Sequence, residues 1–337
     1  MQVRQYVTRR ILFLPVIVLG VSIIVFTLTR LSGSPIGIYQ HPEMNQEEVA
    51  ELEARYHLDE PIPVQYVYWF KGAVTGDLGW SGVSVAPVTS VVPDKLAATI
   101  ELAAAAGLVA VLLGVGLGTI AGANKDRLPD HFVRLFAISG ASLPIFWFGL
   151  LLLIPLYVSW GIFPLGRSDP ELYNEVTHVT GFYTVDSVLS LNPAALGDAL
   201  WHLVLPAVTL GFATTAIIAR MMRSSMVEEV NEDYVDAARA KGLAERLVIR
   251  KHARRNALVP TVTVIGLSFG FLLQGTVVIE LIFRWPGLGQ WVTSAILAGD
   301  QATIMAYVLI TSLIFLLVNL VVDVAYAYLD RRVVLGK

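Results

Sequence analysis

The sequence predicts an all-α membrane protein with six transmembrane helices. Hydrophobic residues make up 55% of the 337 residues, charged residues only 15%, and the mean hydropathy is +0.65. Soluble domains are about 45–50% apolar and about 25% charged. The second observation is that long apolar runs occur six times. About 20 apolar residues in a helix cross a hydrocarbon core of about 30 Å, so each run is long enough to span a bilayer.

The six apolar runs are spread over the whole chain. In order they are Ile11–Thr29, Ala97–Ala123, Phe132–Trp160, Trp201–Met222, Leu258–Phe283 and Ala302–Leu329. The first follows Arg4, Arg9 and Arg10 as a cleavable signal would, but it is longer than a typical signal and no small-residue cleavage site follows it. We expect residues 1–30 to form a retained anchor helix. The third run is long enough to tilt or to extend beyond the bilayer.

Basic residues are divided unequally between the two sides that six spans define. Eighteen of the 24 Lys and Arg residues fall in the termini and in the segments after the second and fourth spans. An excess of Lys and Arg marks cytoplasmic segments. The sequence therefore predicts a multi-pass protein of the cell membrane with both termini in the cytoplasm.

The segment between the first two spans, residues 31–95, is too long for a simple connection. Asn45 and Glu48 form a helix-start pattern, which predicts a helical and partly irregular outer cap. We expect the remaining residues, 96–337, to form a core domain of five spans that includes a cytoplasmic segment, 223–257. The second outer segment, Gly161–Ala199, shows no periodicity from which a fold can be predicted.

The cytoplasmic segment contains the pattern of a short helix over Tyr234–Lys241. Asp233 is the expected N-cap, Asp236 complements the helix dipole in the first turn, and Gly242 suits the left-handed position after the last turn. Two turns are marginally stable alone, so we expect a partner surface to stabilise this helix. Ala237, Ala238 and Ala240 give it a side of small residues that another protein can approach.

This segment resembles the cytoplasmic signature of ABC importer permeases, an E-A-A sequence followed by glycine. Here it reads Asp236-Ala-Ala-Arg-Ala-Lys-Gly242, with aspartate in place of the usual glutamate. Ala238–Leu243 and His252–Pro260 resemble the dipeptide, oligopeptide and nickel branch in particular. Further matches include Gly76-Asp-Leu-Gly79 and the stretch from Asn319 to Asp330, although Gln301-Ala302 replaces a usual Tyr-Pro.

The resemblance implies a type I ABC importer permease with no catalytic residues and no cofactor of its own. A second homologous permease, two ABC ATPase subunits that bind ATP and Mg, and an extracytoplasmic solute-binding protein are the implied partners. The cargo is implied to be a di- or oligopeptide, with oligosaccharides or nickel as alternatives. The residues implied to couple to the ATPase are Tyr234, Asp236, Ala237, Ala238, Arg239, Lys241 and Gly242.

Polar residues inside the spans are candidates for the translocation path, because charge at the bilayer centre costs at least about 2.5–3.5 kcal/mol. Gln274 is one candidate. Asn319 and Asp323 are four residues apart on one helix face, turned either towards the path or towards a neighbouring helix. Glu101 lies in the second span, and Glu280, near the outer end of the fifth span, has an interfacial position as its simplest interpretation.

Several other patterns have simpler explanations. Gly114, Gly118 and Gly122 recur every four residues, a spacing typical of close helix packing. The six histidines show no metal-ligand spacing, so no metal site is predicted. The basic residues Arg250, Lys251, Arg254 and Arg255 indicate contact with lipid headgroups rather than with nucleic acid.

Two other classes of membrane protein are alternatives to the importer permease. A secondary transporter or channel would couple transport to an ion through paired intramembrane charges. A membrane-embedded enzyme would need convergent nucleophile and base residues, which the sequence does not indicate. The chain also has no phosphate-binding P-loop sequence, so ATP must bind to another protein.

Overall fold

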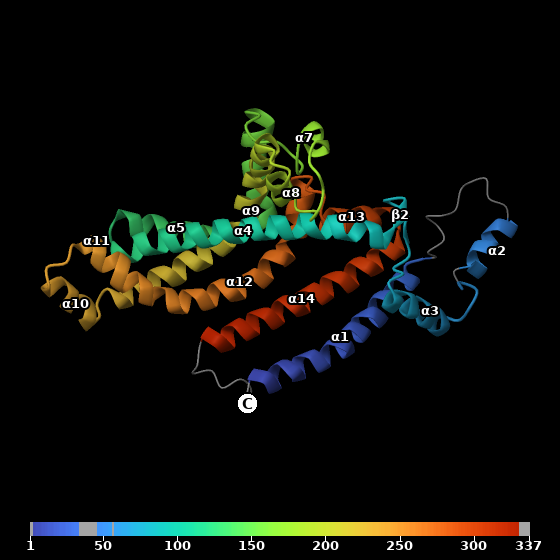
Figure 1. Cartoon of the computed structure of the whole chain (residues 1–337), viewed down its shortest axis with the longest axis horizontal. Helices are drawn as coiled ribbons and strands as arrows, with labels where there is room; N and C mark the ends of the chain where they lie inside the picture. The colour runs from blue at the N-terminus through green and yellow to red at the C-terminus, as the bar shows by residue number, and fades with distance from the viewer. Residues whose placement is uncertain (1–2, 34–45, 56, 330–337) are drawn as a thin grey trace. The chain divides into compact units, whose positions relative to one another are not determined.

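The computed structural model describes residues 3–33, 46–55 and 57–329, and most of them are helical (Figure 1). The chain divides into two compact units. The first contains Met1–Ala97 and Pro286–Val324, and the second contains Ala98–Trp285, with residues 325–337 divided between them. One of the boundaries therefore falls within a single long helix, α4 (Val88–Ala123).

Five described helices or continuous helical runs are long and apolar enough to cross a membrane, and a bent pair makes six if it counts as one span. The five are α1 (Val3–Leu31), α4 (Val88–Ala123), α9 (Pro193–Glu229), the run from α11 (Glu245–Leu247) through η3 (Val248–Ala253) to α12 (Arg254–Ile282), and α14 (Gln301–Leu329). The bent pair is α5 (Leu128–Ser142) with α6 (Ile145–Leu153) and its π-helical extension η2 (Ile154–Ser159). The predicted helical membrane fold is confirmed.

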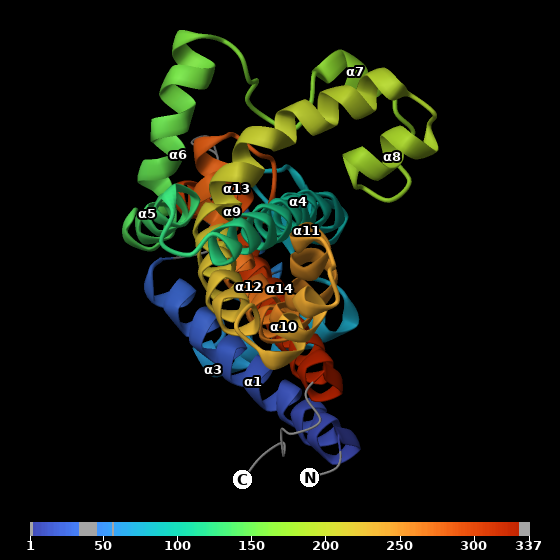
Figure 2. The same cartoon turned by 90° about the vertical axis from the view of Figure 1, so that its left-hand side faces the viewer.

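The third apolar run, expected to tilt or extend beyond the bilayer because of its length, is bent and not one straight helix. It bends by 112° between α5 and α6. The cause is Pro144: a residue before proline is driven out of the helical region, and Leu143 is extended at φ −83° and ψ 127°. Figure 2 shows α6 turning sharply away from α5.

Two helices continue well beyond the apolar runs that predicted them. α9 begins at Pro193, where the Asn192 side chain accepts a hydrogen bond from the Ala195 amide and proline occupies the first helical position. The fifth span begins at Glu245 rather than at Leu258. Hydropathy detects only the part of a helix that lies in lipid, so the polar turns outside it were not counted.

Within the second unit, α4 packs against α9 through glycines. A Cβ atom placed on Gly114, Gly118 or Gly122 would lie 2.7, 2.5 or 2.3 Å from the Cβ of a residue on α9. The three facing residues, Ile218, Met222 and Met226, have the same four-residue spacing. The prediction that these glycines permit close helix packing is confirmed.

The same unit carries two short helices, α7 (Pro170–Asn174) and α8 (Tyr183–Leu189), beside the first part of α9 (Figure 1). The Glu101 carboxylate of α4 holds this segment. It accepts hydrogen bonds from Arg167 Nε and Nη2 at 2.8 and 2.6 Å. It also accepts from the backbone N and Oγ1 of Thr184, both at 2.7 Å.

Glu280, on α12 of the second unit, is fully buried and accepts a hydrogen bond from Thr99 Oγ1 at 2.7 Å. The side chain therefore lies inside the protein, where the hydroxyl of α4 supplies a polar partner in place of water. Its expected interfacial depth stays a prediction.

The first unit contains α1, α14, α13 (Leu288–Ala298) and the expected cap. The cap consists of α2 (Gln46–Arg55), α3 (Ile62–Thr75) and an antiparallel pair of short strands, β1 (Trp80–Ser81) and β2 (Ala86–Pro87). Asn45, the expected start of the cap helix, lies outside the described residues. Buried Asp300 ties the strands to α14, because its Oδ2 accepts hydrogen bonds from Ser81 Oγ at 3.2 Å and Thr303 Oγ1 at 2.7 Å.

Candidate coupling site

The short helix predicted in the cytoplasmic segment is α10, Asp233–Ala240. Asp233 is its first residue rather than its N-cap; Glu232 holds the capping position without a side-chain hydrogen bond, so that prediction was wrong by one residue. The C-terminal prediction is confirmed, because Gly242 has φ +75°. The Gly242 amide donates to Arg239 O at 2.9 Å and the Leu243 amide to Ala238 O at 3.4 Å, the bonding pattern of a Schellman cap.

The two faces of α10 differ in burial. Val235 and Ala238 are buried, with exposed fractions of 0% and 6%. The opposite face is exposed and comprises Asp233, Tyr234, Asp236, Ala237, Ala240 and Lys241. The small-residue side expected to face a partner therefore includes Ala237 and Ala240, but Ala238 packs inside the chain.

The buried face of α10 belongs to a contiguous apolar cluster. Val235 and Ala238 pack in it with Met222 and Met226 of α9 and with Val248 of η3. The cluster also contains Ala253 of η3 and Ala257 of α12. Because the two methionines lie directly over the glycines of α4, α10 is joined through side-chain contacts to α9, α4 and α12.

Polar contacts fix the rim of the site. Arg239 Nη2 donates to Glu245 Oε1 at 2.9 Å, and Arg239 Nη1 donates to Asp236 Oδ1 at 2.9 Å. The hydrogen bonds to Glu245 and then to Asp236 raise the pKa of Arg239, which stays cationic. The Tyr234 hydroxyl donates to Glu229, and burial followed by that bond raises the pKa of Tyr234. Figure 1 shows α10 and α11 together at one end of this unit.

A second polar contact in the same unit was not predicted from the sequence. Fully buried Asp130, at the start of α5, accepts both Nε and Nη2 of Arg223 on α9, the latter at 2.7 Å. Arg134 lies 3.3 Å from the same carboxylate. Arg223 was counted only among the basic residues that set topology, and no spacing rule links it to Asp130, 93 residues away.

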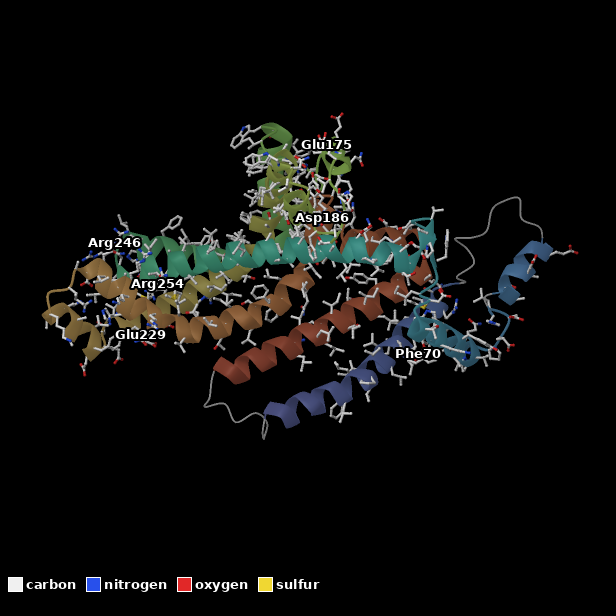
Figure 3. The ribbon with its side chains drawn as sticks, in the orientation of Figure 1. Phe70, Glu175, Asp186, Glu229, Arg246 and Arg254 are labelled. Carbon is white, nitrogen blue, oxygen red and sulfur yellow. The ribbon has the colours of Figure 1, made fainter. Side chains whose placement is uncertain are left out.

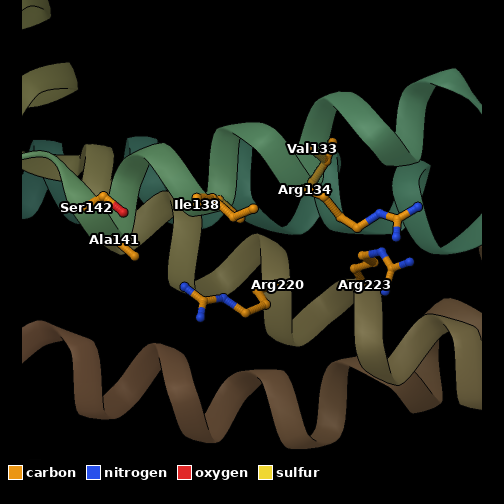
Figure 4. Close-up of a pocket in the computed structure, with 8 residues that line it drawn as sticks. Val133, Arg134, Ile138, Ala141, Ser142, Arg220 and Arg223 are labelled. Atoms are coloured by element: carbon orange, nitrogen blue, oxygen red, sulfur yellow. The ribbon is translucent and has the colours of Figure 1, made fainter.

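A cavity of about 360 Å³ lies beside this contact, between α5 and α9. Arg134, Arg220 and Arg223 line it together with the apolar side chains of α5, as the close-up in Figure 4 shows. Asp130 and Arg223 therefore join α5 to the helix that leads into α10.

The candidate path residues are distributed over both units. Gln274 is exposed on α12 in the second unit, and Asn319 is half-buried on α14 in the first unit. Asp323 also belongs to α14, but its side chain lies outside the described residues.

Comparison with known proteins identifies the class of this fold and site. Residues 114–335 match the family of binding-protein-dependent transport system inner membrane components. The matched residues include α10 and the helices against which it packs, α9, η3 and α12. The chain belongs to this family.

Full-length relatives agree with this assignment. The chain is 39% identical to the probable D,D-dipeptide transport system permease protein DdpB of Escherichia coli K12, over 95% of this chain and 94% of the relative. It is 39% identical to the di/tripeptide transport system permease protein DppB of Pseudomonas aeruginosa UCBPP-PA14, over 98% of each. It is 36% identical to the glutathione transport system permease protein GsiC of Escherichia coli O6:H1, over 98% of each.

The family defines what this chain is. It is a multi-pass inner membrane permease of an ABC importer that works with other transporter subunits and a binding protein. It is a non-catalytic subunit and binds no cofactor itself. Energy for transport must therefore enter the chain through contact with another subunit.

Proposed function

We propose that this permease carries short peptides into the cell and that α10 receives the movement that drives transport. The names of the three relatives above refer to D,D-dipeptide, di/tripeptide and glutathione transport, and all of these cargoes are peptides of two or three residues. Oligosaccharides and nickel, the alternatives open from the sequence, have no support among those names.

The observation that carries the coupling role is the division of α10 into two faces. Its exposed face offers Tyr234, Asp236, Ala237 and Lys241 to an ATPase groove. Its buried face packs on side chains of α9, η3 and α12. A displacement of α10 by the ATPase is passed to these helices, because close-packed side chains move as one body.

A second, homologous permease is the proposed partner within the membrane. Exposed residues of α12 recur at alternating steps of four and three, at positions 267, 271, 274, 278 and 281. Four are apolar and the central one is Gln274. This spacing is typical of a seam between two helices, with one polar residue that fixes the register.

The proposed role of α10 also assigns the other partners and the two sides of the membrane. Two ATPase subunits, which bind ATP and Mg, act on the α10 side, and the solute-binding protein acts on the opposite side. Residues 31–95 and the α7–α8 segment are then extracytoplasmic, both termini are cytoplasmic, and 96–337 form the core that follows the 1–30 anchor. Gln274, Asn319 and Asp323 are the proposed polar residues of the path.

Replacement of Gly242 tests the coupling role. Valine at φ +75° is strained by about 1–2 kcal/mol or more, although a Cβ there meets no atom within 4 Å. We expect Gly242→Val to insert normally and to lower ATP-driven peptide uptake in proteoliposomes by at least about tenfold. Gly242→Asn is the matched control, because asparagine tolerates this conformation, and it should keep most of the uptake. Unchanged uptake in Gly242→Val would contradict the role given to α10.

The cargo is tested separately. Uptake of radiolabelled dipeptide, glutathione, a hexasaccharide and Ni²⁺ is measured in cells with and without the gene for this chain. We expect only the peptides to depend on it. Dependence of sugar or nickel uptake instead would overturn the cargo without affecting the coupling role.

A further inference from the structure

A second cavity, of about 440 Å³, lies in the same unit, where the end of α4 meets α11 and η3. Three arginines line it, Arg246, Arg250 and Arg254, one from each of α11, η3 and α12. Among the residues that the structure describes, none of these three guanidinium groups has an ion-pair or hydrogen-bond partner. Figure 3 shows Arg246 and Arg254 at the same end of the unit as Glu229.

The backbone aligns these three arginines. Residues four apart on an α-helix drift by about 40° around the axis, because each turn holds 3.6 residues. η3 is π-helical from Val248 to Ala253, so its turns are wider and its hydrogen bonds run from residue i to i+5. The π turns offset the drift, and positions 246, 250 and 254 stay on the side that faces the cavity.

The other walls of the cavity are suited to a molecule with one polar end. Ile120, Ala123 and Ile249 are apolar, and Thr119 and Asn124 add a hydroxyl and an amide. The single carboxylate in the lining, Glu245, already accepts two hydrogen bonds from Arg239 at 3.2 and 2.9 Å. The cavity therefore has a strong excess of positive charge.

An exposed apolar stripe leads away from this cavity along α4. Leu108, Leu112 and Ile120, separated by multiples of four residues, are 60%, 63% and 51% exposed. The cavity lies where the apolar run of α4 ends at Ala123, and the end of an apolar run is where we expect lipid headgroups. A charged cavity at headgroup depth that continues into an apolar stripe matches the shape and polarity of a phospholipid.

We propose that this cavity binds the phosphate headgroup of an anionic phospholipid, with an acyl chain lying along the Leu108–Ile120 stripe of α4. Guanidinium groups bind phosphate through paired, charge-assisted hydrogen bonds, which are stronger than contacts of diffuse surface charge. The sequence indicates lipid contact for four basic residues. The structure separates them, because Arg250 and Arg254 line the cavity whereas Lys251 and Arg255 do not.

The proposal is tested by native mass spectrometry of the purified full chain titrated with phosphatidylglycerol or phosphatidylcholine. The test variant is Arg246→Gln/Arg250→Gln. The matched control is Lys251→Gln/Arg255→Gln, which removes the same charge from the same helical run outside the cavity. We expect the test variant to bind phosphatidylglycerol about tenfold more weakly, and the control to stay within about twofold of the unaltered chain. Binding of phosphatidylcholine should not change.

Four results would overturn this site. Equal losses in both double variants would show diffuse attraction of surface charge, and equal binding of the two lipids by the unaltered chain would show no preference for an anion. Competition by soluble glycerol phosphate at the same concentration would show a site for a soluble anion. Undiminished phosphatidylglycerol binding by the test variant would also overturn it, because these arginines would then not hold the lipid.

A charge-conserving variant keeps the test valid if the glutamines disturb folding. Arg246→Lys/Arg250→Lys should keep phosphatidylglycerol binding within about threefold, because lysine also binds phosphate as a point charge. The expected losses are assigned to the cavity only for variants whose circular dichroism and gel-filtration profile match those of the unaltered chain. The chain is tested without ATPase, so a negative result would leave the coupling role of α10 intact.

Discussion

The α7–α8 segment and the α10 segment belong to the same compact unit, but their most deeply buried contacts differ in kind. Glu101 and Asp186 hold the first through hydrogen bonds, and both carboxylates are buried. Val235 and Ala238 hold the second through apolar packing with alanine, valine and methionine side chains. Hydrogen bonds require one geometry, whereas apolar contacts tolerate small displacements. The α7–α8 segment is thus suited to keep its place, and α10 is suited to move with its neighbours.

The largest expected effect tests the apolar connection behind α10. Gly118→Leu places a Cβ 2.5 Å from the Met222 Cβ and 2.6 Å from the Ala219 carbonyl oxygen, so α4 and α9 must separate. We expect the free energy of unfolding to fall by more than about 3 kcal/mol, so that little folded protein accumulates in the membrane. The control is Gly116→Leu on the same helix, where a Cβ meets no atom within 4 Å. Equal yields of the two variants, measured by fluorescence-detected gel filtration, would show that the glycines do not set the packing.

The next effect tests the polar contact. Glu101→Gln leaves Arg167, whose side chain is 6% exposed, without its charge partner. We expect this to lower the free energy of unfolding by about 3–5 kcal/mol. The α7–α8 segment should detach first, so limited proteolysis should cut between residues 161 and 192 before cutting elsewhere. Glu171→Gln, at an exposed glutamate of α7, is the control and should leave the digestion pattern unchanged.

A smaller effect is expected in the α10 cluster. Val235→Ala removes two methyl groups from a fully buried site and should cost about 1–3 kcal/mol in unfolding free energy. Uptake should fall more than ATPase binding does, because the exposed face of α10 is untouched. Val259→Ala, at a valine that is 67% exposed, is the matched control for thermal unfolding. Parallel losses of uptake and ATPase binding would mean that the two faces do not act separately.

The smallest effect concerns pH. Burial of Asp186 opposes its ionisation, but hydrogen bonds from Thr180 and Gly181 outweigh burial and lower the pKa of this carboxyl. Its stabilising effect is therefore complete above the ordinary aspartate pKa of about 3.9 and is lost as the pH falls through the lowered value. Pepsin should cleave the α7–α8 segment more readily below about pH 4, where this stabilisation is lost. In Asp186→Asn the rate of cleavage should no longer change in this way with pH.

The sequence predicted the parts of the fold that depend on local pattern. Hydropathy located every span, and the glycine after residue 241 located the end of α10 within one residue. The four-residue glycine spacing also predicted the close α4 packing, because a helix places such residues on one face.

Long-range contacts could not be predicted in this way. Nothing in the local pattern pairs Asp130 with Arg223 or Glu101 with Arg167. The local pattern also does not show that Ala238 packs inside the chain, whereas Ala237 and Ala240 are exposed. The bend before Pro144 lies within a continuous apolar run, where hydropathy gives no signal and only the proline does. No sequence pattern distinguishes the π-helical turns of η3 from ordinary α-helical turns. The alignment of the three arginines could therefore not be predicted from the sequence either.

The corner at Pro144 has a consequence for the surroundings of the third apolar stretch. Hydrocarbon tails offer no hydrogen bonds, so non-helical backbone is tolerated at membrane depth only next to protein or water. Ala141, Ser142 and Pro144 are nonetheless exposed in the single chain. We therefore expect this corner to lie against solvent or a neighbouring subunit of the importer, and not against fatty acyl chains.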